Sequence, residues 1–392
     1  MKKKKSIQDT EDWKVAEFEY EGLLAQRMFP FFGAPLTNEE MIEILKDILK
    51  DCSEYYPAQL ELGYRYIKEG KDDIGKEFLD KGLSSIKKHF SPKVLKDALY
   101  QICEFLEDHY RFEMAIDYYN LLIDVEKDKA KIYDYTSYCY AYLGDIEKAI
   151  EAEKKALELC DTNYMFYSNM AWLEMIRGNL KSAKEMLKKS INLNGSDKIS
   201  QNNYNICNYM IKSKNIKNWE SYLLREKDLE YLRQKDDEEF EREVISYNND
   251  KIEAFKFYIS RNPKFTPARR YDIMFTLKYV FDVISRMYNG GFFCDDIYNL
   301  NEDFKEIMYK IILETKDIDA EILNDMYDAL LNFYKFLSEK GVAKGYNSLE
   351  DKILKFKPKL LEKIEKYDNV RNNDGYTDEE KREFRKRLIE MD

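Results

Sequence analysis

The sequence is poor in the residues that common enzyme sites require. Its 392 residues include only 2 histidines, 7 prolines and 14 glycines. This leaves little imidazole for acid–base or metal chemistry and few glycines for phosphate-binding loops. The lysines at 2–5 are followed by a polar stretch, so we do not expect a signal peptide. No later segment is a continuous apolar run of the roughly 18 residues that a membrane-spanning helix needs.

Charge and cysteine usage narrow the possible functions further. Lys and Arg total 64 and Asp and Glu total 75, a net charge of −11, which argues against a general nucleic-acid partner because phosphates need a basic surface. The 6 cysteines are widely spaced without a CxxC pair, so we expect reduced thiols, no metal site and no cofactor. These features predict a cytoplasmic protein, and the abundance of Lys, Ile, Asn and Tyr is typical of AT-rich bacterial coding sequences.

Apolar residues recur at helical spacing along almost the whole chain, which predicts an all-α fold. A second period, of 34 residues, places small residues at two positions of four windows. The eighth position holds Gly63, Cys103, Ser137 and Ala171, and the twentieth holds Gly75, Ala115, Ala149 and Ala183. Small residues at both positions let two antiparallel helices approach closely. The period predicts four helical hairpins, over 56–89, 96–129, 130–163 and 164–197.

The turn between the helices of each hairpin shows the same period. Its fifteenth position holds Gly70, Tyr110, Gly144 and Gly178, and glycine there can adopt the left-handed conformation that ends a helix. The pattern resembles the tetratricopeptide repeat family, most clearly at Leu62-Gly63, Tyr66 and Gly70. The resemblance covers 56–197 and implies a superhelix of hairpins. Two departures are Tyr110 in the turn and the absence of the family's proline near the thirty-second position.

The segments outside the repeats are predicted to be helical without a clear repeat. In chain order, N-terminal capping helices over 1–55 contain an apolar loop at 29–35, and 198–250 holds a capping element and a long charged helix. That helix is expected over 217–248 and is followed by a linker at 247–250. A C-terminal helical domain or degenerate repeats follow over 251–367, and a polar loop with a basic terminal helix over 368–392. Pro358 is expected to kink or interrupt the helix that contains it. For the basic cluster at 381–387, a solvated or intramolecular role is favoured over contact with RNA or lipid headgroups.

The resemblance implies that the first helix of each hairpin lines a concave groove. The positions concerned are rich in aromatic residues, with carboxylates in the middle of the array. The groove residues that we expect are Tyr64, Tyr100, Glu104, Glu107, Lys131, Asp134, Tyr138, Tyr142, Trp172 and Met175. Rigid aromatic anchors beside carboxylates favour a protein or peptide segment with apolar anchors and a basic residue. The alternative is that these aromatic residues only pack between hairpins or under the N- and C-terminal capping helices.

Some family members bind the acidic C-terminal tails of chaperones through Lys and Asn at defined groove positions. Here the corresponding positions hold pairs such as Tyr100 with Glu104 and Asp134 with Tyr138. We therefore expect no EEVD-type carboxylate clamp, since an acidic tail would meet like charges.

Three functions remain open from the sequence. The expected one is a non-enzymatic scaffold that binds a protein or peptide through the concave face. The second is a peptide-responsive intracellular regulator whose repeats change curvature when a ligand binds. The third is an unrecognised catalytic activity in 251–367, which contains no histidine and would have to rely on carboxylate chemistry.

Overall fold

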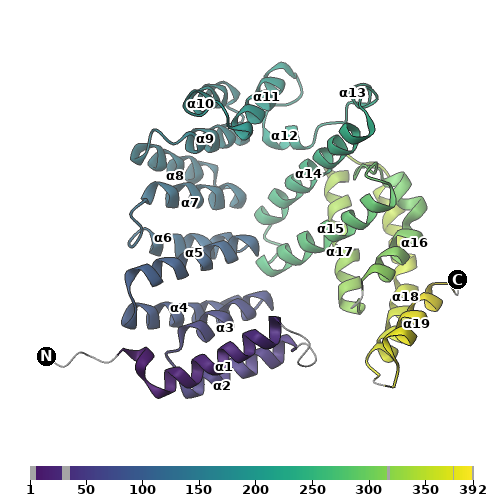
Figure 1. The fold of residues 1–392 in the computed structure, drawn as a ribbon. Helices are drawn as coiled ribbons and strands as arrows, with labels where there is room; N and C mark the ends of the chain where they lie inside the picture. The colour runs from purple at the N-terminus through teal and green to yellow at the C-terminus, as the bar shows by residue number, and fades with distance from the viewer. Residues whose placement is uncertain (1–5, 29–35, 316–317, 374, 391–392) are drawn as a thin grey trace. The chain divides into compact units, whose positions relative to one another are not determined.

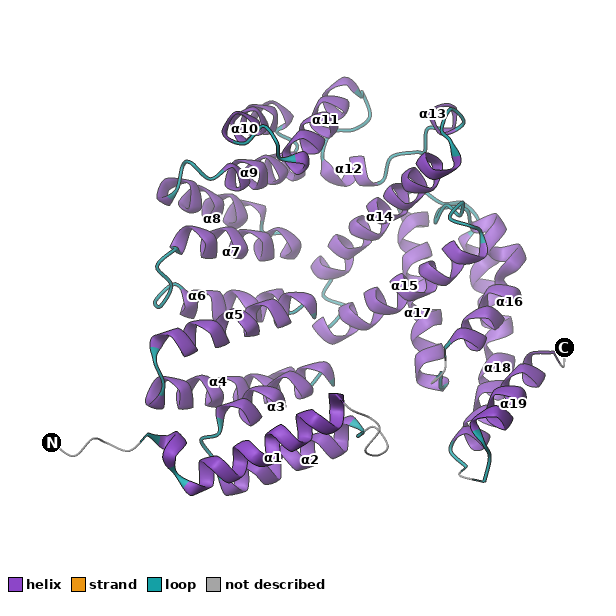
Figure 2. Cartoon of the chain, viewed as in Figure 1, coloured by secondary structure: helices purple, strands orange, loops and turns teal. Residues whose placement is uncertain are grey.

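The computed structural model describes residues 6–28, 36–315, 318–373 and 375–390. Within these ranges every regular element is a helix and no strand occurs (Figure 2), so the predicted all-α class is confirmed. The chain forms two compact units. Unit 1 comprises 1–173, 185–201 and 265–269, and unit 2 comprises 174–184, 202–264 and 270–392. The apolar loop expected at 29–35 lies outside the described residues.

Unit 1 is built from antiparallel helical hairpins that follow one another in chain order (Figure 1). Its helices are η1 (Ile7–Asp9), α1 (Glu11–Met28), α2 (Asn38–Asp51), α3 (Tyr56–Lys68), α4 (Asp72–His89), α5 (Pro92–Asp108), α6 (Phe112–Leu122), α7 (Lys129–Leu143) and α8 (Ile146–Leu159). Helices α9 (Tyr164–Arg177) and α10 (Leu180–Leu193) contribute residues to both units. The extra residues that separate the first two sequence windows lengthen α5 at its start.

Small residues sit where the two helices of a hairpin touch. All eight residues of the two small positions are buried. A Cβ added to Gly75 on α4 would lie 2.5 Å from Cγ1 of Ile67 and 2.8 Å from the carbonyl oxygen of Gly63 on α3. In the next hairpin, Sγ of Cys103 lies 4.0 Å from the carbonyl oxygen of Ala115. The period therefore has the steric cause that the sequence predicted.

The turns of the hairpins share a left-handed residue at the predicted position. Gly70, Gly144 and Gly178 have φ values of 74°, 86° and 87°. Tyr110 adopts the same conformation with φ 61°, although this costs a residue with a side chain roughly 1–2 kcal/mol. Its ring is buried and lies 6.0 Å from the ring of Phe112, so side-chain burial offsets the backbone cost.

Unit 2 is a separate helical assembly whose core is rich in aromatic residues. Its helices are most of α11 (Lys198–Lys212), then α12 (Trp219–Leu223), α13 (Leu229–Leu232), α14 (Asp237–Arg261), most of α15 (Pro267–Met287), α16 (Ile297–Glu314), α17 (Ala320–Glu339), α18 (Tyr346–Arg371) and α19 (Asp378–Glu390). The ring of Phe333 on α17 lies 5.4 Å from that of Phe255 and 5.3 Å from that of Phe281. These contacts join α14, α15 and α17.

The predictions of one long charged helix and of a linker at 247–250 are both wrong. The charged stretch begins with two short helices, α12 and α13, and α14 then runs uninterrupted through the expected linker. The side chain of Asn248 accepts a bond of 2.8 Å from the Cys294 amide and donates one of 2.8 Å to the Phe292 carbonyl. The Tyr247 hydroxyl donates to Asp295 at 3.0 Å. Polar residues that are typical of a linker therefore anchor a distant loop from within a helix.

Pro358 does not interrupt the last long helix. Helix α18 continues on both sides of it, and the polar loop starts after Arg371 rather than at 368. Leu349 and Ile353 before the proline, and Leu360 and Ile364 after it, are buried. Packing on both sides thus outweighs the hydrogen bond that proline cannot donate.

Candidate partner-binding site

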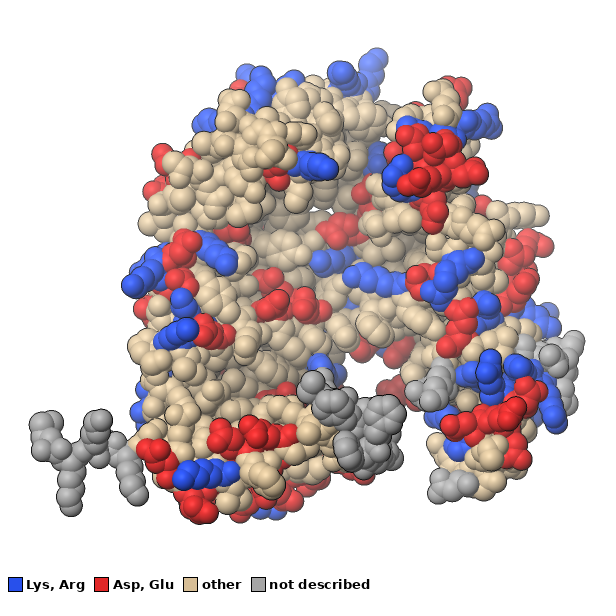
Figure 3. All heavy atoms as spheres, in the orientation of Figure 1, with Lys and Arg blue, Asp and Glu red and all other residues tan. Residues whose placement is uncertain are grey.

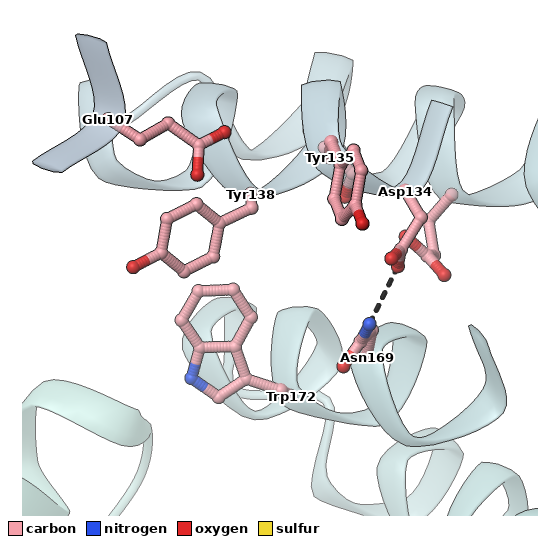
Figure 4. A pocket seen from close by; sticks show the side chains of 8 residues that line it. Glu107, Asp134, Tyr135, Tyr138, Asn169 and Trp172 are labelled. Carbon is pink, nitrogen blue, oxygen red and sulfur yellow. Dashed lines mark hydrogen bonds between the residues drawn. The ribbon is translucent and has the colours of Figure 1, made fainter. Parts of the chain in front are cut away.

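Unit 1 contains a pocket of about 370 Å³ between α5, α7, α8 and the middle of α9 (Figure 4). Its lining residues come from four helices and are Glu107, Asp134, Tyr135, Ser137, Tyr138, Glu153, Asn169 and Trp172. Helix α7 contributes half of them, because Asp134 and Tyr138 are four residues apart and so project from the same face of the helix. Asn169 and Trp172 are similarly neighbours on α9.

One side of the pocket is aromatic. The rings of Tyr138 and Trp172 lie 6.1 Å apart with an angle of 24° between their planes, and Figure 4 shows them next to each other. The ring of Tyr142 lies 4.6 Å from that of Tyr138 and 5.1 Å from that of Phe112, and so supports Tyr138 from behind. Such a wall offers a flat, rigid surface to an apolar or cationic group.

The opposite end of the pocket holds two carboxyl groups from adjacent helices. Asp134 on α7 accepts a hydrogen bond of 2.6 Å from Nδ2 of Asn169 (Figure 4). Glu153 on α8 is 0% exposed, and within the described residues no donor makes a hydrogen bond to either of its carboxyl oxygens. The carboxyl of Asp134 and the hydroxyl of Ser137 are its polar neighbours.

Burial and proximity give these two groups unusual acidities. Burial, followed by the charge of Asp134, raises the pKa of Glu153 to about 10. Burial also raises the pKa of Asp134, although the hydrogen bond from Asn169 opposes this. At neutral pH the pair therefore holds one proton, and a protonated Glu153 can donate to the Asp134 carboxylate.

A third carboxyl, Glu107 on α5, lies near the aromatic side of the pocket. It accepts a hydrogen bond of 2.7 Å from the hydroxyl of Tyr119 and one of 3.4 Å from the thiol of Cys139. Acidic side chains also gather over α5 on the visible surface of unit 1 (Figure 3), where Glu104 and Asp108 are exposed. The field at the pocket is therefore negative, and it would attract a cation.

Two of the expected groove residues are buried and do not line an open surface. Tyr142 is 3% exposed and Met175 is 0% exposed. Tyr142 follows Tyr138 by about one helical turn, and Met175 follows Trp172 in the same way. Both side chains are buried in the core. They are removed from the candidate site as contact residues.

The other expected groove residues lie in different surroundings. Glu107, Asp134, Tyr138 and Trp172 line the pocket together, whereas Glu104 is exposed outside it.

Three further groove residues are engaged within the chain. The ring of Tyr64 lies 4.5 Å from that of Phe105, and its hydroxyl is buried. The hydroxyl of Tyr100 donates to Glu126 at 3.0 Å, and Nζ of Lys131 lies 5.4 Å from the Tyr100 ring centroid.

Sequence reasoning missed the four other lining residues, Tyr135, Ser137, Glu153 and Asn169. The sequence around Glu153 contains a feature that could have identified it. Glu153 interrupts the apolar stripe of α8, whose other members Ala149, Ala152 and Ala156 are buried. A carboxyl group within such a stripe is costly unless it is neutral or paired.

The described part of the chain shows neither a metal cluster nor a membrane-spanning helix. No group of three or more His, Cys, Asp and Glu side chains is arranged to hold a metal ion there. His89 contacts Glu54 at 2.8 Å, and His109 contacts the Phe105 carbonyl at 2.7 Å. None of the described helices is both long and apolar enough to cross a membrane.

Residues 137–163 match the sequence profile of a family described as Tetratricopeptide repeat. The mitochondrial import receptor subunit TOM70 of Mus musculus is 31% identical over 128 residues, which is 32% of this chain and 21% of that protein. Prolyl 4-hydroxylase subunit alpha-1 of Rattus norvegicus is 25% identical over 188 residues, which is 42% of this chain and 35% of that protein. The solved structure of MamA from Desulfovibrio magneticus is 18% identical with a TM-score of 0.33, and covers 48% of this chain and 98% of its own. The chain thus spans about a fifth to a third of the length of these two curated relatives.

Proposed function

Because this chain is a tetratricopeptide repeat protein, we propose that it is a non-enzymatic scaffold that binds a protein or peptide segment through the concave face of its repeats. The observation that carries the proposal is the pocket in unit 1, with Tyr138 and Trp172 on one side and Asp134 on the other. The relative from mouse is named as an import receptor subunit, and recognition of a polypeptide agrees with that name.

The chemistry of the pocket specifies the kind of segment that would bind. The paired rings of Tyr138 and Trp172 can anchor an apolar side chain, because large rigid rings provide contact area at a small entropic cost. The carboxyl groups of Glu107 and Asp134 favour a basic residue beside that anchor and repel an acidic one. The partner is therefore a segment with apolar anchors and a basic residue, and no carboxylate clamp is involved.

Selection of peptides tests this proposal. A display library of random peptides is selected on the wild-type protein and, in parallel, on a variant with Tyr138→Ala and Trp172→Ala. We expect selected sequences that combine apolar and basic residues and that lose binding to the variant. Phe18→Ala, which removes a ring that is 79% exposed on α1, is the matched control and should bind as the wild type does. Equal enrichment on the double variant would remove the pocket from the function.

The alternative is a peptide-responsive regulator whose repeats change curvature. Small-angle scattering with and without a selected peptide separates it from a scaffold. A change in the radius of gyration that persists at saturation would support the regulator, whereas an unchanged radius supports a scaffold that binds without rearranging.

A further inference from the structure

The carboxyl pair at the end of the pocket is a feature that packing alone does not explain. Glu153 is 0% exposed, and neither of its carboxyl oxygens has a partner in good hydrogen-bond geometry among the described residues, although the nearby Ser137 hydroxyl favours its ionised form. Its nearest charged neighbour is another carboxyl, Asp134. A buried carboxyl that faces a second carboxyl and no cation costs stability, because both ionised forms are disfavoured. The same arrangement becomes favourable once a cation enters the pocket.

We propose that the pocket is an arginine-binding pocket, in which the guanidinium group of a partner's arginine pairs with the carboxylates of Asp134 and Glu153 and displaces the proton that they share. The inference rests on the proposed function and adds the identity of the basic residue. No covalent bond changes. The O–H bond of Glu153 breaks, its proton passes to the solvent buffer, and the positive charge of arginine replaces it.

The geometry favours arginine over lysine. The two carboxyl groups come from different helices, α7 and α8, and offer several acceptor oxygens, of which Asn169 occupies one at 2.6 Å. A guanidinium group presents five donors in a plane and can satisfy two carboxylates at once, whereas an ammonium group is compact and more strongly hydrated.

The groups that surround Glu153 are compatible with the exchange of one proton for one cation. On α7 they are Asp134 and the Ser137 hydroxyl, and on α9 the neighbour of Asp134 is the neutral amide of Asn169. The charge of Lys131 acts on Asp134 and favours its ionised form.

Lys131 offsets the charge of the pair only in part, since the pKa of Asp134 stays raised in its presence. Nζ of Lys131 lies over the rings of Tyr100 and Tyr135 at 5.4 and 5.3 Å. Glu107 on α5 adds a further acid, and burial raises the pKa of the Cys139 thiol so that it stays neutral. A guanidinium group therefore has a net negative site to fill.

The pocket also predicts a proton release that an ordinary surface ion pair would not produce. Burial and the charge of Asp134 keep the pKa of Glu153 above neutral. A bound cation favours the ionised form, so binding near neutral pH releases about one proton. Affinity for arginine should then rise with pH until Glu153 is ionised in the free protein.

Matched peptide pools test the arginine itself. Three pools share random flanking residues and carry a central arginine, citrulline or lysine, where citrulline is the neutral isostere of arginine. Capture on the wild-type protein and mass spectrometry give the retained fraction of each pool. We expect the arginine pool to bind about tenfold or more tightly than the other two. Glu153→Gln should remove this preference while Glu158→Gln, on the exposed side of α8, keeps it.

Calorimetry then tests the proton. The tightest peptide of the arginine pool is titrated at neutral pH in two buffers of different ionisation enthalpy. The wild type should release about one proton and Glu153→Gln none.

The outcomes separate this inference from the proposed function. Equal binding of the arginine and citrulline pools, or of the arginine and lysine pools, overturns the arginine pocket but leaves peptide binding intact. Binding of the arginine peptide without proton release also overturns it. If no pool binds at all, the proposed function fails together with the inference.

Discussion

Replacing Glu153 with glutamine should stabilise unit 1 at neutral pH. The native protein must keep this carboxyl protonated, because it is 0% exposed and lies beside Asp134. The unfolded chain ionises freely at the same pH, and this favours unfolding. Glutamine has nearly the same shape, can donate to Asp134 through its amide group, and carries no proton to lose. The substitution therefore removes a cost while it keeps the contact.

The magnitude follows from the raised pKa. A group whose pKa is raised in the native state stabilises it fully below the unfolded pKa, and this contribution is lost as the pH rises toward the native pKa. For Glu153 the window runs from 4.5 to about 10. Each pH unit inside it is worth about 1.4 kcal/mol, so the cost reaches about 4 kcal/mol at pH ~7.5 in the limit of a rigid, dry pocket. With relaxation of the pocket, we expect glutamine to add about 1–4 kcal/mol.

Urea unfolding followed by far-ultraviolet circular dichroism, at pH ~5 and pH ~7.5, measures the effect. The variant should differ from wild type by less than about 1 kcal/mol at the lower pH and by the full amount at the higher pH. Glu158→Gln is the control on the same helix and should change stability by no more than about 0.5 kcal/mol. Equal or lower stability of Glu153→Gln at pH ~7.5 would mean that the carboxyl is ionised or hydrated in the native protein.

Three further predictions concern packing and backbone. Gly75→Ala should destabilise unit 1 by about 1–3 kcal/mol, because the new Cβ would lie 2.8 Å from a backbone oxygen; Gly22→Ala, on α1 with nothing within 4 Å, should be neutral or stabilising in the same urea assay. Gly144→Ala should cost about 1–2 kcal/mol in urea unfolding, because φ there is 86°. Lys251→Met should destabilise unit 2 by about 1–3 kcal/mol. Nζ of Lys251 donates hydrogen bonds of 2.8 Å to the backbone carbonyls of Leu223 and Arg225, and methionine would leave both carbonyls without a donor. Burial lowers the pKa of Lys251 to about 8, so wild-type stability should gain from rising pH between about 8 and 10.5, and thermal melts should show that the variant lacks this gain.

The hairpins could be predicted because their cause is local in the sequence. Gly63 and Gly75 are twelve residues apart, and the steric limit at their crossing recurs in every window, so the period reveals it without knowledge of the fold. The expected linker at 247–250 failed for the opposite reason. Asn248 bonds to residues more than 40 positions away, and composition carries no information about such a partner.

The candidate site divides in the same way. Asp134, Tyr138 and Trp172 could be chosen because their positions in the repeat place them on the first helices of hairpins. Glu153 could not, since it lies on a second helix and joins the pocket only after α8 packs against α7.

The sequence by itself therefore determined the class of fold, the hairpins and the side chains of the aromatic wall, because sterics and helical spacing act over a few turns. Only the tertiary structure decided which carboxyl group is buried beside which, because burial and charge coupling depend on distances across four helices.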